Sequence, residues 1–251
     1  MKIENIRIPA RNNRFLDGRI FSPSATPGGV IVYSHGLFSS KDAYKINTMA
    51  EDITEGGLIL LTFSYGYTAD YTTGNPLHIT LDDTVADLHD ACLFAAQKWS
   101  LPLHLFGSSM GGAASLWLAT GTDLHLSSLT LLATPVDLRG LAMLLSGGKP
   151  AEELPDEGSL SAGEFSITNR SLKELADVDI KSRLHRITSP LLIIHGGVDE
   201  VVDPKNAYLI LEKAGGEKKL HIIEDGDHTL TAPHHLTIIT SQVLSWLSQH
   251  S

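Results

Sequence analysis

The hydrophobic positions of this chain follow two patterns. Near the start, KIENIRI and RFLDGRIFSP alternate apolar and polar residues around a turn, which predicts a half-exposed antiparallel pair of strands. Further along, compact runs rich in Leu, Ile and Val predict strands buried on both faces, as in a parallel sheet. These runs are GVIVYSH, LILLTFS, LHLFGS, LTLLATP, PLLIIHG and KLHIIED.

Helical patterns separate the buried runs. They cover residues 43–55, 81–99, 111–119, 205–214 and 236–247. Buried strands that alternate with amphipathic helices predict an α/β fold, with a mainly parallel, twisted sheet covered by helices on both faces. The sequence shows no repeat, low-complexity tract or linker, so residues 1–251 are expected to form a single domain.

One segment interrupts this alternation. Residues 139–186 separate two buried runs where a few residues would suffice. The segment opens with LAMLL, passes through SGGKPAEELPDEGSLSAGE and closes with the helix-like RSLKELADVDIKSRLHRI. A disordered surface excursion is one interpretation, but the apolar ends favour a cap inserted over the carboxyl edge of the sheet.

Composition narrows the possible partners. A hydrophobic fraction of 42% suits a substantial core, and a formal charge of −10 argues against nucleic acid. Cys92 is the single cysteine and cannot form an internal disulfide. The first residues lack the apolar core of a signal peptide, and no apolar run approaches the ~18 residues of a membrane span. A cytoplasmic protein without a membrane span is therefore expected.

The stretch LHLFGSSMGGAAS places a serine between a buried strand and a helix. The frame Gly-x-Ser-x-Gly fits only Gly107, Ser109 and Gly111. Small neighbours are what a serine on a sharp strand-to-helix turn requires, because strand and helix pass close together there. A phosphate cradle is disfavoured, because no Lys-Ser or Lys-Thr follows the glycines and no GxGxxG frame is present. No cofactor is expected.

A nucleophilic serine needs a base and an acid that orients the base. Among the 12 histidines, His228 follows the last buried run, on a loop at the carboxyl edge, whereas His234 and His235 are expected to be solvated at the start of the final helix. Asp199 follows another buried run and is the candidate acid. Its alternative interpretation is a turn or capping residue, and the rival acids are Asp137 and Asp203.

The chain order Ser109, Asp199, His228 resembles that of the α/β-hydrolase superfamily. The resemblance extends over essentially the whole chain and is carried by YSHGLFSSKDAYK, GSSMGG, HGGVDEVVDP and GDHTL. It implies an α/β-hydrolase fold with an inserted cap and a Ser–His–Asp triad.

The resemblance also implies an oxyanion hole. The backbone N–H groups of Leu37, after His-Gly, and of Met110, after the serine, would donate to the oxyanion, with Phe38 as the alternative to Leu37. His35 is interpreted as structural. Phe38, Met143 and Leu144 are the candidates for substrate contact, the last two because LAMLL belongs to the cap.

Within the superfamily, the HGLFSSK motif, the serine turn and the cap are most similar to small serine esterases, the cinnamoyl and feruloyl esterases and the monoacylglycerol lipases. One departure is Ser64, which stands where members often carry Asp, in TFSYGYTADYTTGNP. The expected function is hydrolysis of a carboxylic ester with a small or medium acyl group, on a small-molecule substrate. Activity would rise with pH as the base loses its proton.

Two other functions compete with esterase activity. A peptidase or aminopeptidase of the same fold would share serine, base and acid, and the acidic AEELPDE of the cap offers carboxylates for an α-amino group. A non-catalytic binding protein on a hydrolase scaffold is the alternative from a different class. Dehalogenase and epoxide hydrolase chemistry are disfavoured by Ser at the turn, and a zinc hydrolase by the lack of H-E-x-x-H or a Cys/His cluster, so no metal is expected.

Overall fold

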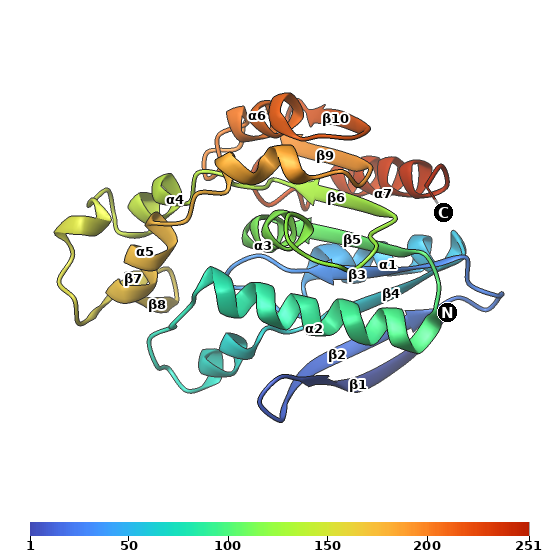
Figure 1. Ribbon diagram of the computed structural model, residues 1–251, viewed down its shortest axis with the longest axis horizontal. Helices are drawn as coiled ribbons and strands as arrows, with labels where there is room; N and C mark the ends of the chain where they lie inside the picture. The colour runs from blue at the N-terminus through green and yellow to red at the C-terminus, as the bar shows by residue number, and fades with distance from the viewer. Residues whose placement is uncertain (251) are drawn as a thin grey trace.

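The computed structural model describes residues 1–250. An eight-stranded sheet has the order β1-β2-β4-β3-β5-β6-β9-β10 (Figure 1). β2 is antiparallel to both of its neighbours, and all pairs from β4 to β10 are parallel. The strands are β1 (Lys2–Ala10), β2 (Arg14–Ser22), β3 (Gly29–Ser34), β4 (Leu58–Phe63), β5 (Leu103–Ser108), β6 (Ser128–Leu132), β9 (Leu191–Gly196) and β10 (Lys218–Ile223).

Helices cover both faces of this sheet. α1 (Tyr44–Glu55) and α7 (Pro233–Leu247) pack on one face, and α2 (Leu81–Trp99), α3 (Met110–Ala119) and α6 (Lys205–Lys213) on the other. α2 has the predicted bounds, and α7 begins three residues before the predicted start because Pro233 supplies a favourable first helical residue. The predicted mainly parallel sheet with helices on both faces is confirmed.

The buried runs lie between two hydrophobic clusters, one on each face of the sheet. In β5, Leu103 and Leu105 face the cluster under α2 and α3, whereas Phe106 faces the cluster under α1 and α7. Since neighbouring side chains of a strand point to opposite faces, both sets are buried and the run is apolar throughout.

The segment between β6 and β9 lies beyond the carboxyl ends of the strands, at the left of Figure 1, and the N-terminus lies at the opposite side. It carries a third hydrophobic cluster that includes Leu154, Ile167 and Leu172. Its elements are α4 (Leu138–Leu145), the 3-10 turn η2 (Ala151–Glu153), β7 (Ser159–Ala162), β8 (Phe165–Thr168), α5 (Asn169–Ala176) and the 3-10 turn η3 (Lys181–Arg186).

The hairpin β7–β8 is tied to the chain that precedes α2. Leu77 N–H donates to the Ser166 carbonyl at 2.8 Å, and Thr168 N–H donates to the Leu77 carbonyl at 3.0 Å. A 3-10 turn, η1 (Gly66–Thr72), lies in the same preceding segment. Across residues 1–250, every helix is too short or too polar to cross a lipid bilayer.

Candidate active site

Ser109 occupies a tight turn between β5 and α3. Its backbone has φ +52° and ψ −122°, in the region that L residues rarely adopt. A Cβ on Gly107 would lie 2.6 Å from the Gly112 Cα, and one on Gly111 would collide with the carbonyl oxygens of Ser34 and His35. The turn therefore requires glycine on both sides of the serine.

Three side chains form a continuous hydrogen-bonded chain. Ser109 Oγ lies 3.0 Å from His228 Nε2, and His228 Nδ1 lies 2.8 Å from Asp199 Oδ2. Asp199 follows β9 and His228 follows β10, which pair in parallel, so the two loops lie side by side at the carboxyl edge. A proton on Nδ1 that is donated to the carboxylate leaves Nε2 free to accept the serine O–H.

Asp199 is held by its own turn as well as by the histidine. Its Oδ1 accepts the N–H groups of Val201 at 2.9 Å and Val202 at 2.8 Å. Burial favours the neutral acid, but hydrogen bonds from His195, His228 and Val202 outweigh it and keep the pKa of Asp199 well below its usual value. Asp199 is thus an ionised turn residue that also holds the histidine.

Two neighbours of Asp199 were not anticipated as parts of the site. The His195 ring, fully buried in β9, lies with Nε2 2.8 Å from the Val202 carbonyl and 3.3 Å from Asp199 Oδ2. Lys45 of α1 lies near Asp199 and Asp227; burial lowers its pKa to about 8, and these carboxylates oppose the shift. The only sequence signal for His195 was its spacing of four residues from Asp199.

The rival acids lie elsewhere. Asp137 caps α4 by accepting Gly140 N–H at 3.3 Å and pairs with Lys181. Asp203 accepts Lys205 N–H at 2.8 Å, at the start of α6. Neither carboxylate contacts His228.

The rival histidines also lie apart from the serine. His234 Nε2 contacts Asp225 at 2.8 Å, and its side chain is exposed. His235 is 4% exposed, so the expectation that it is solvated is wrong: the first turn of α7 points it inward.

The two expected oxyanion donors, the backbone N–H groups of Leu37 and Met110, belong to the residues that follow Gly36 and Ser109. Gly36 and Ser109 are in contact, because a Cβ on Gly36 would lie 3.2 Å from Ser109 Cβ. Within the described residues, neither Leu37 N–H nor Met110 N–H donates to another group of the protein. Met110 is the first residue of α3, where the helix dipole favours negative charge.

His35 fixes the loop that carries Leu37. Its Nδ1 lies 2.8 Å from the Gly36 carbonyl, and its Nε2 accepts Tyr65 N–H at 3.3 Å. Burial lowers the pKa of His35 to about 4, so the ring is neutral at pH 7. These contacts give His35 a structural role.

The expected substrate-contact residues have different surroundings. Phe38, at φ +57°, stacks on Phe165 of β8 with ring centroids 5.1 Å apart. Met143 and Leu144 of α4 are 46% and 49% exposed. Leu144 also lines a cavity of about 470 Å³ beside the loop of Asp199.

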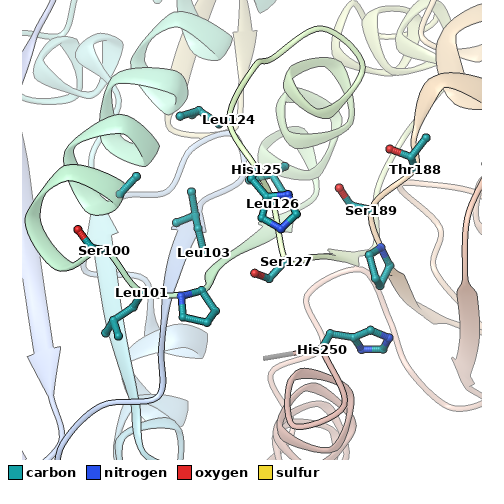
Figure 2. A pocket seen from close by; sticks show the side chains of 13 residues that line it. Ser100, Leu101, Leu103, Leu124, His125, Leu126, Ser127, Thr188, Ser189 and His250 are labelled. Carbon is teal, nitrogen blue, oxygen red and sulfur yellow. The ribbon is translucent and has the colours of Figure 1, made fainter.

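A larger cavity, of about 830 Å³, lies at the opposite end of the sheet (Figure 2). Leu103 at the start of β5, Ser127 before β6 and His250 after α7 line it. Because ligands of open α/β sheets bind at the carboxyl ends of the strands, this cavity is no part of the candidate site.

The Ser109 site can be compared with known proteins. A family model described as Serine aminopeptidase, S33, matches residues 162–232, which include Asp199 and His228 but not Ser109. Monoglyceride lipase of Mus musculus is 23% identical over 272 residues, covering 94% of this chain and 88% of that protein.

Solved structures are similar over nearly the whole chain. Est1E from Butyrivibrio proteoclasticus has a TM-score of 0.82 at 18% identity, covering 98% of each chain. The esterase domain of a Rhodothermus marinus protein has a TM-score of 0.77 at 23% identity, covering 100% of this chain and 99% of that one. The fold is that of the α/β-hydrolases, and the relatives include an esterase and a monoglyceride lipase.

Proposed function

We propose that this protein is a serine hydrolase that cleaves carboxylic esters through an acyl-enzyme. The hydrogen-bonded chain from Ser109 through His228 to Asp199, set in a strained turn, is the observation that carries the proposal. Similarity to a monoglyceride lipase and to an esterase domain supports ester hydrolysis.

The first step is attack by Ser109 Oγ on the carbonyl carbon of the ester. His228 Nε2, at 3.0 Å, takes the serine proton as the Oγ–C bond forms, and the carbonyl electron pair moves to oxygen. Asp199 stabilises the imidazolium through Nδ1, and it stays ionised because two backbone N–H groups also bind it. The negative oxygen would lie between Leu37 N–H and Met110 N–H.

The second half of the reaction reverses these roles. The tetrahedral intermediate collapses, and His228 gives its proton to the leaving alkoxide, which departs as an alcohol. Water then attacks the acyl carbon while His228 takes its proton, and the acid leaves when the proton returns to Ser109. None of these reaction steps requires a cofactor.

The segment from residue 139 to 186 serves in this proposal as a cap over the site. Its hydrophobic cluster includes Leu37 and Phe38 at its edge, so the cap packs against the loop beside Ser109. We propose that Phe38, Met143 and Leu144 contact a small or medium acyl group of a small-molecule ester. Substitutions of Met143 or Leu144, which are half exposed, should change acyl preference more than stability.

An aminopeptidase needs a carboxylate that is placed to bind a free α-amino group. Among the cap carboxylates, Glu152 pairs with Arg139 and Asp156 with Lys173, and all four acidic residues of AEELPDE (Glu152, Glu153, Asp156 and Glu157) are exposed. None is therefore set in a buried site, and ester hydrolysis is the favoured function.

The test is a panel of p-nitrophenyl esters from acetate to long-chain acyl, together with monoacylglycerols, aryl esters and aminoacyl amides. We expect kcat/KM to be highest for esters of short or medium acyl chains, and the amides to react slowly or not at all. Ser109→Ala is the control for background hydrolysis. Efficient turnover of the aminoacyl amides with inert esters would overturn the proposal in favour of the peptidase.

A further inference from the structure

We propose that Asp225, His234 and His235 bind one divalent transition-metal ion, of which Zn²⁺ is the best match. The three residues lie at the two ends of the loop that joins β10 to α7 and holds His228. The site is separate from the Ser109 chemistry and does not depend on the function proposed above.

The geometry brings three donor groups together. His234 Nε2 lies 2.8 Å from Asp225 Oδ2, and His235 Nε2 lies 3.3 Å from Asp225 Oδ1. One ligand atom from each of the three residues lies within 4.8 Å of the others. In a tetrahedral zinc site with bonds of about 2.0–2.1 Å, donor atoms lie about 3.3 Å apart. Small side-chain rotations therefore suffice to enclose an ion.

His235 is an independent reason to expect a ligand. Its side chain is 6% exposed, and neither of its ring nitrogens makes a hydrogen bond within residues 1–250. Buried polar atoms without a partner are rare in folded proteins because each loses its hydration. Nε2 lies 3.3 Å from Asp225 Oδ1 without forming a hydrogen bond to it, and a shared cation would give this nitrogen a strong partner.

The chemistry of the donors selects the class of ion. Imidazole suits Zn²⁺, Cu²⁺ and Ni²⁺, whereas Mg²⁺ and Ca²⁺ prefer sites made of oxygen ligands. Asp225 and His234 are exposed, so water can complete the coordination sphere. The N-terminal end of α7 disfavours a cation, but the charge of the Asp225 carboxylate opposes that effect.

The position of the site gives the ion a structural role. Asp225 lies before His228 and His234 after it, so a shared ion cross-links both ends of the histidine loop. An ion that binds only the folded protein stabilises the folded state, because the unfolded chain lacks the assembled site. We expect the ion to rigidify the loop without taking part in ester cleavage.

The experiment uses the full chain, freed of metal with EDTA and then dialysed. Titration with ZnCl₂ in a calorimeter should show one ion per chain, and saturating ZnCl₂ should raise Tm by about 3 °C or more. MgCl₂ should produce neither effect. His234→Ala and Asp225→Asn change exposed side chains and should fold normally, yet lower the zinc affinity by at least about tenfold.

His185→Ala is the matched control, because it removes an exposed histidine from η3 and should leave the zinc affinity and the Tm shift unchanged. Wild-type protein that binds no zinc would overturn the proposal. So would an affinity and a Tm shift that survive in both His234→Ala and Asp225→Asn, because the ion would then bind elsewhere.

Discussion

The orientation of His228 depends on one carboxylate. Asp199 accepts the N–H groups of Val201 and Val202 with one oxygen and contacts His228 and His195 through the other. The backbone bonds prevent rotation of the carboxylate, and the buried His195 lies behind it. The carboxylate is therefore positioned before any substrate arrives.

We predict that Asp199→Asn lowers kcat by about three to four orders of magnitude. The amide cannot stabilise the imidazolium, and its NH₂ group favours the wrong histidine tautomer. Steady-state kinetics should show at most small losses for Asp137→Asn and Asp203→Asn, whose carboxylates bind groups at the starts of α4 and α6 and do not contact His228. A large loss confined to Asp137→Asn would move the acid to the loop after β6.

The three hydrogen-bonded residues could be predicted from the sequence, but the residues that support them could not. Ser109, Asp199 and His228 could be chosen because each follows a buried run and ends at one edge of the sheet. His195 could not, because the pattern of a buried strand does not show that one of its side chains meets the next loop. The burial of His235 was not predicted because α7 begins at Pro233, before the predicted start, and its first turn points this side chain inward.

At the scale of elements, the cap hairpin and the oxyanion loop pack together. Phe38 is held at φ +57° on that loop and stacks on Phe165 of β8, and Tyr71 of η1 packs on the same ring at 4.6 Å. Since the N–H of Leu37 belongs to the residue before Phe38, we expect the aromatic stack to help position this proposed oxyanion donor.

Phe165→Ala should lower kcat about 2- to 13-fold while KM changes less, because an aromatic pair contributes about 0.5–1.5 kcal/mol beyond its buried area. Phe15→Ala, on β2 and 50% exposed, is the matched control and should leave kcat unchanged. If Phe165→Ala raises KM alone, the ring binds substrate and does not position the loop.

Helices and strands differ in how well the hydrophobic pattern predicts them. Helix α2 was predicted with its observed bounds because its apolar residues repeat along 19 positions. The strands β7 and β8 have four residues each, and the serines of SLSA and FSIT give no hydrophobic run. β8 also bonds to Leu77, which is far away in the chain, and no local pattern reveals this contact.

For the whole molecule, two buried histidines link stability to pH. His35 and His104 lie in the interior, and burial lowers the pKa of each to about 4. His104 also contacts Ser128 Oγ at 2.9 Å through Nδ1. In the unfolded chain, both rings would take up protons near pH 6.5.

The free energy of unfolding should therefore fall as the pH drops from 6.5 towards 4. In this range the two histidines bind protons in the unfolded chain but stay neutral in the folded protein. Each histidine contributes about 1.4 kcal/mol of lost stability per pH unit in this window, and neither contributes above it. Urea unfolding at pH 7, 6 and 5 should show a shallower decline for His104→Asn than for wild type. His185→Asn should keep the wild-type slope, and an equal slope in His104→Asn would contradict the expectation.

The most direct test of the account is to locate the adduct of a fluorophosphonate on the folded protein by peptide mass spectrometry. We predict one phosphonyl group per chain on Ser109, retained in Ser108→Ala and absent from Ser109→Ala. Folded wild-type protein that stays unlabelled, or that carries the adduct on another residue, would contradict a nucleophilic Ser109 and favour a binding protein on a hydrolase scaffold.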